Sequence, residues 1–532
     1  MTGDGHCCLV SLRTIHRILW SEGRASTSRV DGRGGESSTG NTLVCGRSSY
    51  HNGYAMSATL QKPDWVEARA YQRRAIASWL DNGGHGILQM ATGTGKTVTA
   101  LQAATELAQR LDNRLALFIA VPYQHLVDQW AEDLDDFGTQ PVLAYQSRKQ
   151  WQEQLERELV EFNMGSRSSV VVITTHDTFA MEPFQAAIDR VSGVERMLIA
   201  DEVHHLGAPH RRDALPESIK LRLGLSATPK RWYDDEGTAD LFDYFGGVVF
   251  EYGLEQAIEN DDLAEYYYVP HVVELTPDET KQYMALSRAI GKLISKVEGD
   301  LSDADLQGHQ ELKQLLFKRA RLIGTAANKL ERLESLLSQT EQVKHTLVYC
   351  GDGSVDDSVS GETKRHVDAT VTRLRDNLDI NAHRFTAREN QATREELLTE
   401  FERGDLDALV AIRCLDEGID VPATQTAYIL ASSSNPRQFV QRRGRILRTH
   451  PGKEYAVIHD FITIPQTEID PTLLDDDQFN AERNLLRKEL ERVATFAGAA
   501  RNHPDADIQG IPSSSGPFSL QELKRQYNLL QM

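Results

Sequence analysis

Short apolar runs alternate with amphipathic segments of helical periodicity along most of this 532-residue chain. In the N-terminal half the pattern predicts strands at 86–89, 115–121, 169–174, 196–200 and 221–225 and a helix at 123–137. In the C-terminal half it predicts strands at 346–350, 381–385, 407–412, 426–430 and 455–459, with helices between them. Strands that alternate with helices favour parallel sheets covered by helices on both faces. We therefore expect an α/β fold with two sheet domains in tandem, each with its ligand at the carboxyl ends of its strands.

Three further segments surround these two sheet domains. The expected order is a disordered N-terminal extension, a first sheet domain, a linker with a helical insertion, a second sheet domain and a small helical tail, at 1–55, 56–255, 256–340, 341–465 and 466–532. Within the insertion, apolar residues recur near helical spacing. Its Lys318, Arg319 and Arg321 would either bind phosphate or form a solvated helix face, and both interpretations stay open.

The first 55 residues differ in composition from the rest of the chain. They hold six Arg and no Lys, with many Gly and Ser, and their low apolar content predicts disorder. We expect that translation starts near Met56; a functional tail is the alternative, and the segment weakly resembles a mitochondrial transit peptide. Three of the five cysteines lie there, which leaves Cys350 and Cys414 and no disulfide framework. So few thiols favour a reducing compartment, and we expect the cytoplasm.

A glycine-rich turn follows the predicted strand at 86–89. The segment Met90–Thr97 leads into a helix expected to begin near Thr97. In such a strand–turn–helix unit, backbone N–H groups and the helix N-terminus bind phosphate. Lys96 would reach the β- and γ-phosphates, and the Thr97 hydroxyl would bind Mg²⁺. The strict pattern has glycine where this chain has Met90, so the sequence predicts a variant phosphate-binding loop.

Two acids end the apolar run at 196–200, about 105 residues after the glycine-rich turn. An enzyme with a phosphate-binding loop needs one acid at the end of a neighbouring strand to hold Mg²⁺ and a base to orient the attacking water. Asp201 suits the first role and Glu202 the second. Two solvated acids at a strand end would be the simpler interpretation, but their position after an apolar strand favours the metal and water roles.

A glutamine and two arginines recur at helical spacing near the end of the second sheet domain. Gln441, Arg445 and Arg448 stand four and three residues apart, so on a helix they share one face. Phosphoryl transfer spreads negative charge over phosphate oxygens, and arginine stabilises that charge with two hydrogen bonds. We therefore expect these residues to complement the phosphate-binding loop rather than to form a solvated basic face.

Together these elements resemble those of the superfamily 2 helicases and translocases, over about residues 65–465 and in the order of the family's motifs. The matching segments are Arg69–Gln72, Met90–Thr97, Ala120–Leu126, Ile173–His176, Asp201–His204, Ser226–Thr228, Thr346–Cys350, Asp416–Pro422 and Gln441–Arg448. Leu223–Pro229 and Gly418–Pro422 are similar to the branch of XPB-type repair helicases and restriction-enzyme motor subunits. The resemblance implies two RecA-like parallel-sheet domains that close on ATP and Mg²⁺.

The resemblance also implies a role for each matching residue. ATP binding falls to Arg69, Gln72, Gly93, Thr94, Gly95, Lys96, Thr97, Gly418 and Asp420. The residues expected to bind Mg²⁺ are Thr97 and Asp201, and the residues expected to be catalytic are Glu202, Gln441, Arg445 and Arg448. Coupling between nucleotide state and domain movement falls to His204, Ser226 and Thr228. Contacts with nucleic acid fall to Pro122, Gln124, Thr175 and His176.

The expected partner is nucleic acid, and the chain does not contain the DEAD tetrapeptide, which favours DNA over RNA. An RNA helicase and a nucleic-acid-binding regulator with weak ATPase activity remain the alternatives. The net charge of −20 means that a local groove rather than a bulk basic surface would bind the nucleic acid. We expect no membrane partner, because no apolar run is long enough to span a bilayer.

The C-terminal tail shows a helical pattern. Asp475–Asp477 would cap a helix that begins near Phe479. Glu522 and Lys524 have the spacing of some nuclease sites, but they lie in a helical pattern without the strand and preceding acid that such a site needs. We therefore expect a motor without a nuclease of its own. In a restriction system, a separate nuclease or methylase subunit would complete the activity.

Overall fold

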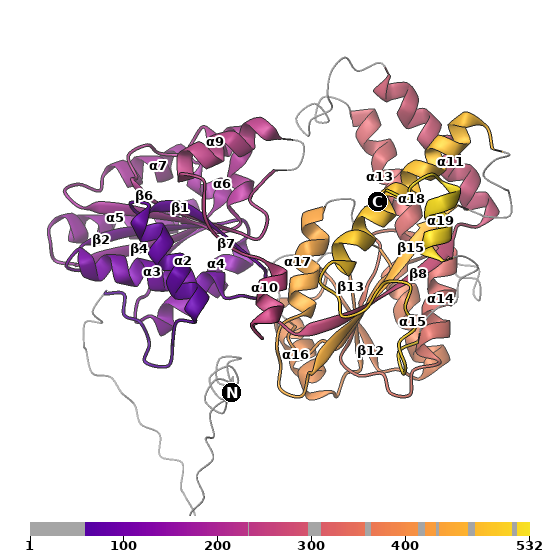
Figure 1. Ribbon diagram of the computed structural model, residues 1–532. Coiled ribbons are helices and arrows are strands. Elements are labelled where there is room, and N and C mark those ends of the chain that lie inside the picture. Colours follow the sequence, from indigo (N-terminus) through magenta and orange to yellow (C-terminus); the bar gives the residue numbers. More distant parts are fainter. Residues whose placement is uncertain are drawn as a thin grey trace, which may run out of the picture.

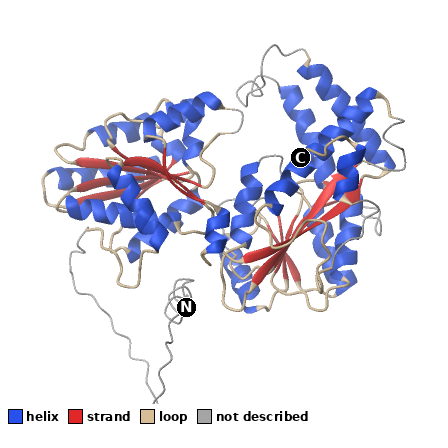
Figure 2. Cartoon of the chain, viewed as in Figure 1, coloured by secondary structure: helices blue, strands red, loops and turns tan. Residues whose placement is uncertain are grey.

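The computed structural model describes residues 59–231, 234–295, 310–356, 363–412, 421–431, 436–465, 474–512 and 519–531. Two lobes lie side by side, and each is built around a parallel sheet with helices on both faces (Figures 1 and 2). The expected α/β fold with two RecA-like sheet domains is confirmed. The predicted disorder of 1–55, and the predicted nucleotide contacts of Gly418 and Asp420, lie outside the described residues.

The first sheet has the strand order β3-β4-β2-β5-β6-β1-β7, and its neighbouring strands are parallel. Its strands are β1 (His85–Met90), β2 (Leu115–Val121), β3 (Val142–Ala144), β4 (Ser169–Thr175), β5 (Glu195–Ala200), β6 (Leu221–Ser226) and β7 (Val248–Tyr252). All residues of β2 and β4 are buried, as expected for strands covered on both faces. The five predicted strands are confirmed. The prediction missed the edge strands β3 and β7, since β3 is very short and β7 is only half-buried.

The order of the first sheet decides where its loops meet. Strands β5, β6 and β1 are adjacent and parallel, so the segments that follow them leave the same edge of the sheet side by side. These segments carry Asp201, Ser226 and the phosphate-binding loop. The helices of this lobe are α2 (Ala70–Asp81), α3 (Lys96–Arg110), α4 (Gln124–Asp136), α5 (Arg148–Asn163), α6 (His176–Phe179), α7 (Glu182–Asp189), η1 (Val203–Gly207), α8 (Pro209–Arg212) and α9 (Asp235–Phe245).

The second sheet has the strand order β12-β13-β9-β14-β15-β8, again in parallel. Its strands are β8 (Glu265–Glu274), β9 (Thr346–Tyr349), β12 (Ala382–Phe385), β13 (Ala408–Ala411), β14 (Thr426–Ile429) and β15 (Tyr455–Ile464). Five of these strands are predicted from the sequence and confirmed. Strand β8 was missed: it lies in the segment expected as linker and insertion, and it pairs with β15 along its whole length.

The remaining elements of the second lobe surround this sheet. They are the linker helix α10 (Leu254–Glu259), the helices α15 (His366–Leu378), α16 (Gln391–Arg403) and α17 (Pro436–Ile446), and a small antiparallel pair, β10 (Ser354–Asp356) with β11 (Thr363–Arg365). Helix α17 carries Gln441 and Arg445. The orientation of helix α17 therefore decides whether the side chains of these predicted site residues lie against the first lobe.

The insertion between the lobes is helical, as predicted. Helices α11 (Pro277–Ile294) and α13 (Gln310–Gly324) pair and project from the second lobe, while α14 (Ala327–Leu337) packs beside α15 (Figure 1). Arg319 donates a hydrogen bond to Ser287 Oγ at 3.4 Å and lies over the ring of Tyr283, so its side chain packs within the hairpin. Phosphate binding by Lys318 and Arg321 stays a prediction.

The C-terminal segment is part of the second lobe's core. Helix α18 (Asp476–Ala497) packs on β15 and β8, and α19 (Leu520–Gln526) follows it. The Asp475 carboxylate accepts the Gln478 N–H at 2.8 Å, which confirms the predicted cap. The buried Arg492 donates to Asp460 at 2.8 and 3.1 Å, and a charge at this depth is tolerated only when it is paired in this way. The predicted boundaries at 255, 340 and 465 stay predictions, but the segments on either side of 465 share one core.

Among the residues that the structure describes, no helix has both the length and the apolar character that crossing a membrane requires.

Candidate active site

The glycine-rich loop after β1 turns through two residues with left-handed backbone. Gly93 has φ +91° and Gly95 has φ +75°, a region that favours glycine. Lys96 is the first residue of α3, one position earlier than expected, and its ammonium group donates to the Met90 carbonyl oxygen at 3.4 Å. A helix N-terminus and a lysine therefore lie together at the carboxyl edge of the sheet, as a phosphate-binding loop requires.

The predicted adenine-binding residues lie beside this loop. The side-chain oxygen of Gln72 accepts the Arg69 N–H at 2.9 Å, and Arg69 forms an ion pair with Asp262 of the linker. Between them, the Tyr71 hydroxyl donates to the Thr94 carbonyl oxygen at 2.6 Å and thus holds the loop to α2. The sequence prediction missed Tyr71, because no spacing rule distinguishes an anchoring tyrosine from a core tyrosine.

The two acids follow β5 at the same edge of the sheet. Asp201 is 9% exposed; its Oδ2 accepts the indole N–H of Trp130 at 3.1 Å and its Oδ1 accepts the Glu202 N–H at 2.9 Å. Burial raises the pKa of both carboxyl groups, and the positive charge of Lys96 opposes that shift. Glu202 has φ +43°, a left-handed backbone that costs a non-glycine residue about 1–2 kcal/mol.

Ser226, the last residue of β6, joins the acids to the next strand. Its hydroxyl donates to Glu202 Oε2 at 3.2 Å, lies 3.1 Å from His204 Nδ1 and accepts the Thr228 N–H at 3.1 Å. The structure thus brings together the three residues that were predicted to couple nucleotide state to movement. Their coupling role stays a prediction.

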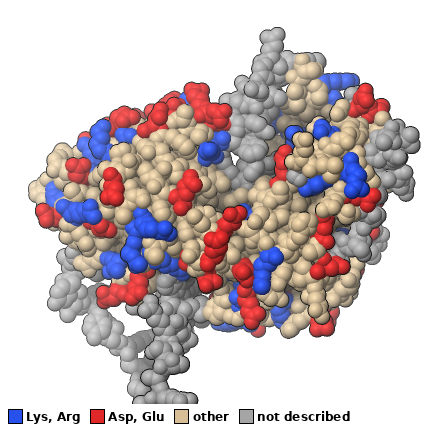
Figure 3. Space-filling view, viewed as in Figure 1, with Lys and Arg blue, Asp and Glu red and all other residues tan. Residues whose placement is uncertain are grey.

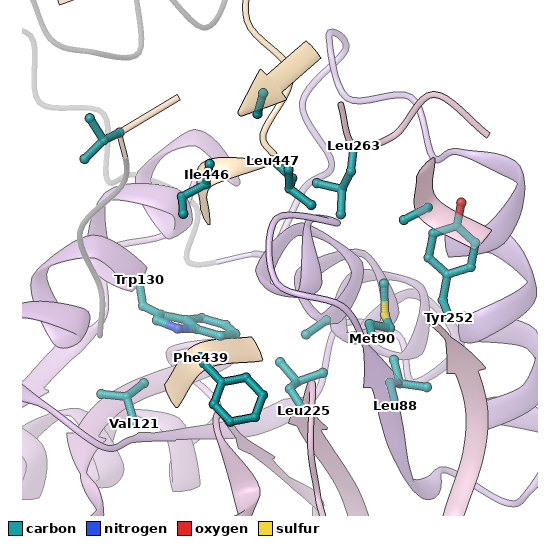
Figure 4. Packing of buried hydrophobic residues seen from close by; sticks show 14 of the residues in the cluster. Leu88, Met90, Val121, Trp130, Leu225, Tyr252, Leu263, Phe439, Ile446 and Leu447 are labelled. Carbon is teal, nitrogen blue, oxygen red and sulfur yellow. The ribbon is translucent and has the colours of Figure 1, made fainter. Parts of the chain in front are cut away.

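Helix α17 brings the second lobe against the phosphate-binding loop. The positive charge of Arg445 lies near Asp201 and Glu202, where it adds to Lys96 in opposing the burial that raises their pKa. Arg448 forms a β-bridge with Leu263, and its Cγ would lie 3.2 Å from a Cβ placed on Gly93. Gln441, on the same helix, is buried. Figure 4 shows how closely the lobes approach: Met90 and Leu225 of the first lobe lie in one apolar cluster with Ile446 and Leu447 of the second.

These residues fit ATP and Mg²⁺. Two glycines with positive φ allow the loop backbone to approach a phosphate closely, Lys96 supplies a positive charge, and the Asp201 carboxylate is of the kind that binds Mg²⁺. The hydroxyls of Thr92 and Thr228 are buried without a hydrogen-bond partner in the described part of the chain. Thr92 lies where the lobes meet, next to Gly444, and Thr228 lies beside Ser226, so a phosphate group bound at this edge would offer acceptors near both.

The predicted nucleic-acid contacts fall into two groups. Pro122 and Gln124 lie at the start of α4, and the Gln124 side chain is exposed. Thr175 is buried and its hydroxyl caps α6 by accepting the Thr178 N–H, while His176 is completely buried. The side chains of Thr175 and His176 thus pack in the interior of the first lobe, and the contacts of all four residues with nucleic acid stay predictions.

Gly444 offers a test of the close approach of the lobes. A Cβ at this position would lie 2.7 Å from Thr92 Cβ and 2.8 Å from its carbonyl oxygen. We expect Gly444→Ala to lower ATP turnover about 100-fold, because a displacement of about 1 Å at a catalytic site has an effect of this size. The matched control is Gly291→Ala, since Gly291 is also helical but has open space around it. Unchanged turnover in a folded Gly444→Ala protein would mean that this approach is not needed.

Two family models match this chain. The first lobe matches the type III restriction enzyme, res subunit, over residues 66–231, and the second lobe matches the helicase conserved C-terminal domain over residues 328–450. The matches together span more than half of the chain and contain all the predicted site residues. The chain belongs to the superfamily 2 helicases and translocases, and it is a motor ATPase of that class.

Within this class the chain is similar to XPB-type proteins and to restriction-enzyme subunits. It is 26% identical over 400 residues to DNA 3'-5' translocase XPB2 of Sulfurisphaera tokodaii. This alignment covers 72% of this chain and 79% of that protein. It is 24% identical over 411 residues to DNA 3'-5' helicase XPB of Kineococcus radiotolerans, with 75% and 60% covered. It is 28% identical over 295 residues to the type I restriction enzyme EcoAI endonuclease subunit of Escherichia coli, with 53% and 32% covered.

A solved structure supports the fold. The chain superimposes on the ATP-dependent type ISP restriction-modification enzyme LlaBIII bound to DNA with a TM-score of 0.54 and 18% identity. The match covers 88% of this chain but 33% of that one. At this level of identity the likeness concerns the fold alone, and it extends over both lobes.

Proposed function

We propose that this protein is an ATP-dependent DNA translocase or helicase that acts in DNA repair or in restriction. The observation that carries the proposal is the close approach of helix α17 to the phosphate-binding loop: a Cβ on Gly444 would lie 2.7 Å from Thr92 Cβ, and the charge of the neighbouring Arg445 acts on Asp201 and Glu202 of the first lobe. A site divided in this way is complete only while the lobes are together. Hydrolysis and lobe movement are then coupled, which is the requirement for moving along a strand.

In the proposed mechanism the first lobe binds and the second completes the site. The N–H groups of the loop and Lys96 would hold the phosphates, and Thr97 and Asp201 would hold Mg²⁺, which would supply neutralising charge when bound. Glu202 orients the attacking water and accepts its proton, and the hydroxyl of Ser226 keeps the carboxylate in place. Arg445 would donate hydrogen bonds to the phosphate oxygens, on which negative charge develops during the transfer.

The choice of DNA over RNA is supported by the relatives, which are named as DNA translocases and helicases. A bulk basic surface is not the proposed binding device: on the face shown in Figure 3, acidic and basic side chains are interspersed over both lobes. We propose instead a local contact that includes Pro122 and Gln124. The restriction relatives make a separate nuclease or methylase partner part of the proposal. Location in the cytoplasm stays a prediction from the scarcity of cysteine.

The test is ATP turnover with and without nucleic acid. We expect single-stranded or duplex DNA to stimulate turnover more than RNA of the same sequence, with Lys96→Ala as the inactive control. Stronger stimulation by RNA would favour an RNA helicase. No stimulation by either would favour the alternative of a nucleic-acid-binding regulator with weak ATPase activity. Displacement of a labelled strand, or of a third strand from a triplex, then separates unwinding from translocation.

A further inference from the structure

Trp130 contacts the predicted metal-binding carboxylate although it lies outside every motif that the sequence suggested. It is on α4, its side chain is 1% exposed, and its indole N–H donates to Asp201 Oδ2 at 3.1 Å. Figure 4 shows the indole within the buried apolar cluster, near Val121. A buried indole N–H needs an acceptor, but a carboxylate of the candidate active site is not the usual one.

The same lobe contains a tryptophan with a purely structural hydrogen bond. Trp79 is completely buried, and its indole N–H donates at 3.0 Å to the carbonyl oxygen of Arg222. Arg222 lies near the start of β6, whereas the site lies beyond the strand's other end, at Ser226. The two tryptophans thus donate hydrogen bonds of similar length, one to a carboxylate within the site and one to a backbone carbonyl oxygen away from it.

The Asp201 carboxylate is held at both oxygens. Trp130 binds Oδ2, and the Glu202 N–H binds Oδ1 at 2.9 Å. A carboxylate has about four lone-pair positions, so about one on each oxygen remains for Mg²⁺ or its water ligands. Two donors on different oxygens also fix the plane of the Asp201 carboxylate, so the direction of its remaining lone pairs is fixed as well.

We propose that Trp130 is a positioning residue for Asp201, whose indole N–H orients the carboxylate toward the metal bound at the phosphate-binding loop. This inference rests on the proposed function, because it assumes a Mg²⁺–ATP site. Residues that orient a metal ligand typically change metal affinity or activity 10- to 100-fold when they are removed.

Helix α4 extends the inference toward nucleic acid. The helix begins at Gln124, a predicted nucleic-acid contact, and Trp130 lies six residues further, about 9 Å along the axis. Val127 and Leu134 of the same helix are completely buried, so one packed helix joins the predicted contact at Gln124 to Trp130. A shift of its first turn on nucleic-acid binding would move the indole relative to Asp201, which links nucleic-acid contact to the metal site.

The decisive variant is Trp130→Phe, which removes the N–H and keeps an aromatic ring. We expect the Mg²⁺ concentration for half-maximal turnover to rise about 10-fold. We also expect Mg²⁺-dependent ATP binding, measured by calorimetry without turnover, to weaken by a similar factor, while ATP binding in EDTA stays unchanged. Trp79→Phe is the matched control, because it loses the same kind of hydrogen bond outside the site. Equal Mg²⁺ affinity in wild type, Trp130→Phe and Trp79→Phe would overturn the proposal.

Two further measurements complete the test. In wild-type protein labelled with fluorotryptophan, the ¹⁹F resonance of Trp130 should shift when Mg²⁺ is added with ADP, and an unmoved resonance would count against the proposal even if Trp130→Phe does not fold. Gln124→Ala and Trp130→Phe should be non-additive in their effects on DNA stimulation, and additivity would overturn the link through α4. Failure of the proposed function would appear differently, as a wild-type protein that no nucleic acid stimulates.

Discussion

Replacement of Arg445 by alanine is expected to lower the turnover number for ATP about 10³- to 10⁵-fold, the range found when an arginine that stabilises the transferred phosphate is removed. The side chain comes from α17, and its charge lies near Asp201 and Glu202 across the boundary between the lobes. Because Lys96 and the loop belong to the first lobe, ATP binding itself should change little. Steady-state hydrolysis combined with nucleotide-binding measurements separates the two effects.

Two comparisons sharpen this prediction. Arg445→Lys keeps the positive charge but loses the planar fork of donors, so its turnover should lie between those of wild type and Arg445→Ala. Arg373→Ala is the control: this arginine also lies on a helix of the second lobe, but it donates to Glu334 at 3.2 Å, away from the site. If Arg445→Ala retained turnover within tenfold of wild type, the divided site would not exist in the working protein.

Glu202→Gln is expected to lower turnover about 10²- to 10⁴-fold, the usual contribution of a general base, while ATP binding persists. The amide cannot accept the water's proton, but it fills the same space and can still accept the Ser226 hydroxyl that now bonds Glu202 Oε2. Single-turnover hydrolysis and nucleotide binding measure the two effects. Glu195→Gln, on an exposed residue at the other end of β5, is the matched control.

The pH profile gives a second measurement on the same residue. Burial raises the pKa of Glu202 above its ordinary value, and Lys96 opposes the shift. The base is the ionised form, so wild-type turnover should fall as the pH is lowered through this raised pKa. Glu202→Gln has no carboxyl group at this position and should lose that limb of the profile. A Glu202→Gln protein with the wild-type profile would show that another group is the base.

Local pattern was enough to predict most strands of both sheets. Strand β2 is seven apolar residues, all buried, and so could be recognised without any knowledge of its partners. Strand β8 was missed because it pairs with β15, almost two hundred residues away, and because its buried residues are interrupted by half-buried and exposed ones, so no continuous apolar run marks it. Helix α18 was expected in a small tail, yet its Arg492 pairs with Asp460 of β15 inside the core.

For the candidate active site, too, local sequence predicted some features and only the tertiary structure decided the others. The predicted Lys96, Asp201 and Glu202 lie together because β1 and β5 are close in one parallel sheet, an order that no local pattern contains. The role of Trp130 could not be found from sequence, because the apolar face of α4 already accounts for a buried residue there, whether or not its N–H meets a carboxylate. The burial of His176 could not be predicted from the sequence either, since a histidine that follows a strand can contact nucleic acid at the surface or pack in the core.

The sequence by itself determined most of the elements, their order and the chemical groups that follow them, because hydrophobic period, glycine placement and charge act over a few residues. Only the tertiary structure decided which groups meet: Gly444 against Thr92, Arg445 beside the two acids and Trp130 on Asp201. Such contacts depend on the strand order of each sheet and on the packing of one lobe against the other. Those are properties of the whole folded chain, which no short stretch of residues carries.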